Sequence, residues 1–120
     1  MCFRSWSILG ALGISFLIAV PTKVSAEVPT FTITIRDHRF EPAELSVPAN
    51  EKFKLVIQNE DPSEEEFESY ELNREEVVDG GDEITVFIGP LKPGSYEYFG
   101  DFHQETAQGV IKAVEAGDEK

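Results

Sequence analysis

Apolar and polar side chains alternate with a period of two residues through most of the chain after residue 30. In "FTITIR", Phe31, Ile33 and Ile35 alternate with threonines, which is typical of a strand buried on one face. Turn-forming Gly, Pro, Asn and Asp residues separate six further segments with strand character: 43–51, 52–59, 67–72, 83–90, 92–99 and 107–115. About seven short strands and no convincing helix predict an all-β fold, a Greek-key β-sandwich or barrel.

The first 26 residues differ from the rest of the chain. "MCFRSWSILGALGISFLIAVPTKVSA" has Arg4 near its start, an apolar run from Ile8 to Val20 and an end of small residues. This pattern is typical of a secretory signal peptide that is cleaved after Ala26. The apolar run is shorter than the ~20 residues of a spanning helix, which favours cleavage over a membrane anchor. We therefore expect a signal peptide at 1–26 and one exported domain at 27–120, with no membrane insertion after cleavage.

Charge and sulfur content narrow the classes of function. The chain has a formal net charge of −13, and residues 1–26 hold two of its ten basic residues and none of its acidic ones. So acidic a domain repels nucleic acid and anionic membranes, and it suits cations or a basic partner. Cys2 and Met1 are the only sulfur-containing residues of the chain. The exported domain can therefore form no disulfide and offers no sulfur ligand.

Two stretches of the domain carry a specific likeness. They are "PAELSVPANEKFKLVIQNEDPSEEEFES" (42–69) and "GPLKPGSYEYFGDFHQETAQGVI" (89–111). Together they resemble the cupredoxin-like domains of bacterial periplasmic iron-uptake systems, and "EFES" followed by "DFH" is the most specific pair. The resemblance implies a periplasmic location, with a membrane iron permease and a periplasmic iron-binding protein as partners.

The general copper pattern of cupredoxins is incomplete in this chain. By the resemblance, Gly100 stands where the copper cysteine belongs, Ala107 where the methionine belongs, and His103 where the second histidine belongs, with Glu65 nearest the position of the first histidine. A type 1 copper site depends on a short bond to a thiolate. Blue-copper electron transfer is therefore excluded.

Oxygen ligands take the place of sulfur in the expected site. The resemblance implies that the "EFES" and "DFH" segments meet at one end of the sandwich. Period-two geometry turns Phe67 into the core and Glu66 and Glu68 outward together, and it places Asp101 and His103 on one side of an extended loop. Carboxylates with an imidazole suit Fe, Mn, Cu(II) or Zn. The expected metal is iron, with copper as a second or substitute metal; the preferred ligands are Glu66, Glu68, Asp101 and His103, with Glu65 and Glu105 in reserve.

His38 is left out of this ligand set, because Arg36 and Arg39 stand close to it in "RDHRF".

Three functions remain open. The first is an accessory protein of iron uptake that binds iron and passes it to a permease system. The second is a ferroxidase-like oxidoreductase with copper at the His103 loop, and the third is a metal-free acidic module that docks a basic partner. Binding is favoured over catalysis, because a site without sulfur holds Cu(I) poorly.

Overall fold

The computed structural model describes residues 10, 13–20 and 27–117. Most of the expected signal peptide, 1–26, lies outside the described residues, so the leader and its cleavage site stay predictions. Within the described part of the chain, no helix is long and apolar enough to cross a membrane.

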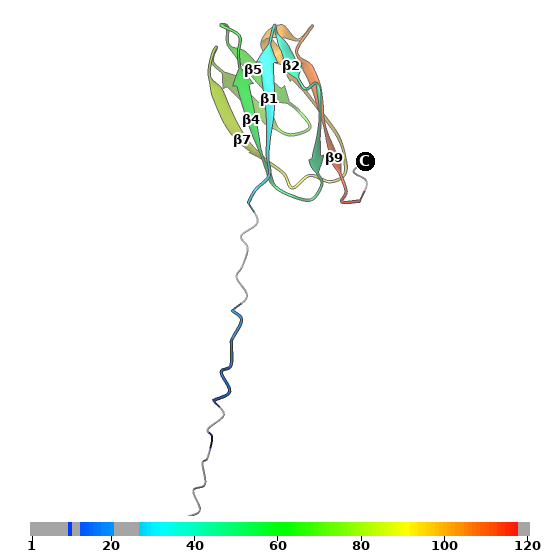
Figure 1. The fold of residues 1–120 in the computed structure, drawn as a ribbon. Helices are drawn as coiled ribbons and strands as arrows, with labels where there is room; N and C mark the ends of the chain where they lie inside the picture. The colour runs from blue at the N-terminus through cyan, green and yellow to red at the C-terminus, as the bar shows by residue number, and fades with distance from the viewer. Residues whose placement is uncertain (1–9, 11–12, 21–26, 118–120) are drawn as a thin grey trace, which may run out of the picture.

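Two β-sheets pack against each other as a sandwich (Figure 1). One sheet has the strand order β2-β1-β4-β7 and the other β3-β9-β8-β5-β6. The pairs β1·β4 and β3·β9 are parallel, and the other pairs are antiparallel. The all-β sandwich expected from the sequence is confirmed. Its strands are β1 (Thr30–Arg36), β2 (Arg39–Glu41), β3 (Glu44–Pro48), β4 (Phe53–Asn59), β5 (Glu65–Ser69), β6 (Arg74–Val78), β7 (Glu83–Ile88), β8 (Gly94–Gly100) and β9 (Gln108–Val114).

The described residues form nine strands, where the sequence pattern suggested about seven. The two additional strands, β2 and β6, are short and mostly exposed, so neither shows a clear apolar alternation. β2 follows β1 after the two-residue turn Asp37–His38, in which both residues have positive φ, 52° and 58°. Such a turn matches the twist of paired antiparallel strands. It folds β2 back onto β1 and places His38 at the tip of the hairpin.

The core lies between the sheets and contains the alternating residues that the pattern assigned to it. Ile33, Ile35, Phe53, Leu55, Ile57 and Ile111 are all fully buried. Three aromatic rings pack beside them: the Phe40 and Phe67 centroids each lie 5.0 Å from the Tyr98 centroid. Phe67 belongs to β5, which contains "EFES", and Tyr98 belongs to β8, which leads into "DFH". This packing therefore holds the strands of the two segments together.

Strand pairing brings these two segments to one end of the sandwich. Phe67 of β5 pairs with Gly100 of β8, and the 3₁₀ turn η1 (Asp101–His103) follows Gly100 directly. The tip of the β1–β2 hairpin reaches the same end, because His38 lies against His103. The expected meeting of "EFES" and "DFH" is confirmed.

Candidate metal centre

Glu65 is a buried carboxylate that ties β5 to η1. Its residue surface is 1% exposed. Oε1 accepts hydrogen bonds from the backbone N–H groups of Phe102 (3.0 Å) and Glu66 (3.1 Å), and Oε2 lies 2.5 Å from His103 Nδ1. Buried carboxylates are stable only when such partners compensate for their lost hydration. Glu65 therefore fixes the position of the η1 turn and of the His103 ring.

A first group of possible ligands surrounds Glu65. His38, Glu65 and His103 each offer one ligand atom, and these atoms lie within 4.8 Å of one another. The two imidazole rings stack, with centroids 3.6 Å apart and planes at 14°. Two imidazoles and a carboxylate form the donor set of many non-haem Fe(II) sites, and they also suit Cu(II) and Zn.

The sequence interpretation left His38 out because of Arg36 and Arg39, but the structure stacks its ring on that of His103, and acidic side chains bind one of the two arginines. The Arg36 guanidinium is bound by Glu41 (2.7 Å) and Glu60 (2.6 Å), which offset its charge. The signal for the position of His38 is the short hairpin turn after β1. Its contact with His103, 65 residues further along the chain, depends on the tertiary fold.

Asp61 holds the turn that carries His38. Its carboxylate accepts hydrogen bonds from the backbone N–H groups of Asp37 (2.8 Å) and His38 (2.9 Å), and Oδ2 lies 3.5 Å from His38 Nδ1. Burial, the largest single effect, raises the pKa of Asp61, but the two hydrogen bonds together with the charge interactions of His38 and His103 outweigh it, and the pKa is lowered. An ionised carboxylate beside the imidazole is the usual support of a metal-binding histidine.

A second group consists of carboxylates alone. One oxygen from each of Glu66, Glu68 and Asp101 lies within 4.8 Å of the others. Glu75 stands directly opposite Glu68 in the β5·β6 pair. Like charges in such a position destabilise a sheet, and among the described residues none of these four carboxylates makes an ion pair with a basic side chain.

The close spacing of the carboxylates in the second group raises the pKa values of two of them. The pKa of Glu66 is raised to about 7, first by a hydrogen bond with Glu75, then by burial, and then by the charges of Glu75, Asp101 and Glu68. The pKa of Glu68 is also raised, first by burial and then by Asp101 and Glu75. A multivalent cation would relieve this repulsion.

The structure separates two residues that the sequence interpretation placed together. Asp101 and His103 were expected on one side of an extended loop, but the segment is a 3₁₀ turn. With three residues per turn, residues two apart point in different directions. Asp101 therefore joins Glu66 and Glu68, while His103 joins Glu65. Glu105 is exposed and belongs to neither group.

A type 1 copper site does not fit this loop. A Cβ atom added to Gly100 would lie 2.6 Å from Ala107 Cβ and 2.7 Å from Glu65 Cδ. The Glu65 carboxylate thus fills the space that a cysteine side chain at position 100 would need. Residues 27–117 also contain neither cysteine nor methionine.

Comparison with known proteins agrees with this architecture. A family model described as "Cupredoxin-like domain" matches residues 8–113. An uncharacterized protein of Rickettsia prowazekii (strain Madrid E) is 48% identical over 91 residues, which cover 76% of this chain and 73% of the relative.

Solved structures share the fold at low sequence identity. Auracyanin A, a "blue" copper protein from Chloroflexus aurantiacus, is similar with a TM-score of 0.64 and 13% identity, over 73% of this chain and all of that chain. The metal-binding domain, with Cu(I), of a Cu(I)-exporting P-type ATPase from Streptococcus pneumoniae D39 has a TM-score of 0.61 and 18% identity. That match covers 72% of this chain and 85% of that domain. At these identities the likeness supports the fold alone.

Proposed function

Because the chain belongs to the cupredoxin-like domain family, we propose that it is a periplasmic metal-binding protein that carries iron and passes it to a membrane permease system. Solved proteins with this fold include copper-binding ones, as their descriptions state. The resemblance of "EFES" and "DFH" to domains of iron-uptake systems gives iron as the metal, and a periplasmic iron-binding protein as a further partner.

The observation that carries the proposal is the group formed by Glu66, Glu68 and Asp101. These three side chains converge within 4.8 Å, and Glu66 is only 8% exposed. Among the described residues no basic side chain forms an ion pair with the Glu66 carboxylate. Carboxylate oxygens alone suit hard cations and would hold Cu(I) poorly. A cargo ion that binds there offsets the repulsion, and the repulsion returns when the ion leaves.

Iron binding should be directly measurable by calorimetry on metal-free protein. Titration with Fe(II) without oxygen, and with Fe(III) citrate, should show saturable binding at micromolar concentrations for at least one oxidation state. Millimolar Mg²⁺ should not displace the iron, because Mg²⁺ gives up its hydration water reluctantly. Absence of saturable binding for both oxidation states would overturn the proposal. The transport role has its own measurement: cells that lack the protein should accumulate less ⁵⁵Fe under iron limitation.

A ferroxidase-like activity is the second candidate, and the adjacency of the two ligand groups favours it. Asp101 and His103 belong to the same turn, so a redox metal and an iron ion would sit near each other. Copper fits the first group as Cu(II), held by His38, Glu65 and His103. When bound there, Cu(II) can accept the single electron that Fe(II) loses on oxidation.

Oxidation by copper-loaded protein distinguishes this candidate from binding alone. Fe(III) should form faster than with the same concentration of free copper, and His103→Ala should lower the rate to that of free copper. Glu105→Gln is the matched control, because Glu105 lies in the same loop but in neither ligand group. A parent rate no higher than that of free copper would leave binding as the function.

A further inference from the structure

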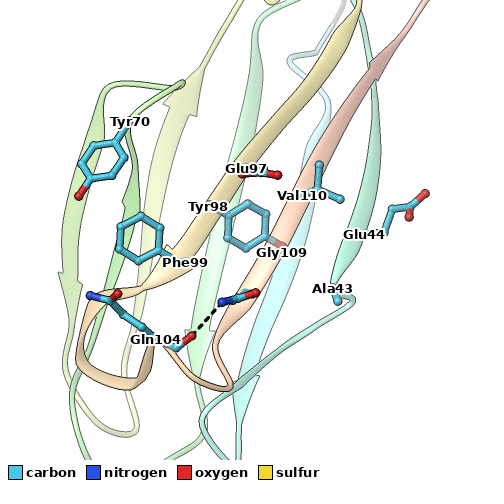
Figure 2. Close-up of a pocket in the computed structure, with 10 residues that line it drawn as sticks. Ala43, Glu44, Tyr70, Glu97, Tyr98, Phe99, Gln104, Gly109 and Val110 are labelled. Carbon is cyan, nitrogen blue, oxygen red and sulfur yellow. Dashed lines mark hydrogen bonds between the residues drawn. The ribbon is translucent and has the colours of Figure 1, made fainter.

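A groove lies on the outer face of the second sheet, over β8 and β9 (Figure 2). Its volume is about 610 Å³, which is in the range of ligand-binding clefts. Glu97 and Phe99 face the groove because they alternate along β8 with the buried Tyr98. The side chains relevant to recognition are Glu44, Tyr70, Glu97, Phe99, Gln104 and Gln108.

Two aromatic rings form one side of this groove. Figure 2 shows Tyr70 and Phe99 next to each other there, with Glu44 on the other side and Glu97 on the strand between them. The Tyr70 and Phe99 centroids are 5.5 Å apart, and Tyr70 is 79% exposed. A ring this exposed leaves its face open to a ligand. Ring faces attract cations, and the planar guanidinium of arginine stacks on them most often.

The charged side chains that line the groove are all acidic. Of the residues at positions 27–117, Glu44 and Glu97 are its charged lining residues, and no basic side chain from this part of the chain lines it. Glu44 is already paired with Lys112 (2.8 Å). Within the part of the chain that the structure describes, the Glu97 carboxylate makes no ion pair or hydrogen bond. The groove therefore offers one carboxylate without a partner, close to two aromatic rings.

One end of the groove reaches the candidate metal centre. The Gln104 side chain donates a hydrogen bond to Asp101 Oδ1 (2.7 Å), and the Gln104 backbone oxygen accepts one from Gln108 Nε2 (3.0 Å), drawn as a dashed line in Figure 2. A segment that occupies the groove would thus contact the loop that carries Asp101 and His103.

We propose that this groove binds an extended basic segment of a partner protein. An arginine of that segment stacks its guanidinium on Tyr70 and Phe99 and pairs with Glu97. Charge complementarity selects this occupant, because a second copy of a chain with net charge −13 and nucleic acid are both repelled. The inference goes beyond metal binding and does not require it.

An NMR titration of the metal-free protein with short peptides tests the proposal. The probe is acetyl-Gly-Arg-Gly-Arg-Gly-amide, compared with peptides in which both arginines are replaced by lysine or by glutamate. The arginine peptide should shift the amide signals of Tyr70, Phe99, Gln104 and Gln108, and it should bind several-fold more tightly than the lysine peptide. The glutamate peptide should leave these signals unchanged.

Two variants and a control complete the design. Glu97→Gln and Tyr70→Ala should each weaken binding of the arginine peptide about tenfold, since they remove the ion pair and the stacking face. Glu51→Gln makes the same charge change at an exposed residue outside the groove and should have little effect. Equal affinity for the lysine peptide, equal weakening by Glu51→Gln, or no shifts at millimolar peptide would overturn the proposal. Iron titration of Glu97→Gln keeps this outcome separate from that of the proposed function.

Discussion

Replacing Glu66 by glutamine should stabilise the metal-free protein above pH 7 and weaken its iron binding at least about tenfold. The pKa of Glu66 in the folded protein is about 7, against an ordinary value of 4.5. Below pH 4.5 the group is protonated in both the folded and the unfolded state, so the pKa difference has no effect on stability. Between 4.5 and 7 the unfolded state loses its proton first, and the free energy of unfolding falls as pH rises. Above pH 7 the loss is complete.

Glutamine at position 66 removes this pH dependence. Its amide carries no charge and can donate a hydrogen bond to Glu75 at every pH, whereas Glu66 needs a proton to do so. Denaturation curves in chelator from pH 4.5 to 8 should therefore diverge, with the variant more stable at the upper end. Glu64→Gln is the matched control, because Glu64 is exposed and stands two residues before Glu66, and its curve should follow that of the parent.

The same substitution should reduce the stabilisation that iron provides to about half or less at the same iron concentration. A ligand at 100 times its dissociation constant stabilises a protein by about 2.7 kcal/mol. The parent should gain this increment with iron, while the variant should bind at least about tenfold more weakly, since a carboxamide is a weaker ligand than a carboxylate. If the variant binds iron like the parent, Glu66 is not a ligand. If it is less stable than the parent at pH 8 in chelator, the four carboxylates do not repel each other as inferred.

Period-two alternation predicted the sheet faces well because it depends on the backbone alone. In β5 it assigned Phe67 to the core face and Glu66 and Glu68 to the outer face. The burial of Phe67 confirms the first assignment, and Glu65 and Ser69, two residues away on either side, are buried with it. Glu66 lies on the expected outer face, yet it is only 8% exposed, and Glu75 of β6 and Asp101 of η1 stand close to its carboxylate.

The details of the candidate metal centre depend on contacts that local sequence does not contain. Glu65 is compensated by Phe102 and His103, which lie 37 and 38 residues away along the chain. The 3₁₀ turn that separates Asp101 from His103 has no clear signal in "DFH". His38 reaches the site through the two-residue turn Asp37–His38, in which both residues have positive φ. Neither residue type by itself predicts this left-handed backbone. The sequence could therefore predict which residue types act as ligands and at which end of the sandwich they lie. It could not predict that these residues divide into two separate ligand groups.

Replacing Glu65 by alanine should cost about 2–5 kcal/mol of unfolding free energy, because a buried N–H group left without its acceptor costs about 1–3 kcal/mol and two such groups lose theirs. The substitution leaves the Phe102 and Glu66 N–H groups without their acceptor and removes the partner of His103 Nδ1. Urea denaturation in chelator measures the change. Glu64→Ala, one residue earlier and exposed, should stay within about 0.5 kcal/mol of the parent.

Glu65→Gln separates the role of hydrogen bonding from that of charge. The glutamine oxygen can still accept from the Phe102 and Glu66 N–H groups, so this variant should retain most of the stability that alanine loses. It presents an amide nitrogen instead of Oε2 to His103 and should bind Cu(II) at least about tenfold more weakly than the parent. A loss below about 1 kcal/mol for the alanine variant would mean that Glu65 does not anchor η1. In that case Asp101 and His103 owe their positions to the β8–β9 connection rather than to the hydrogen bonds of Glu65.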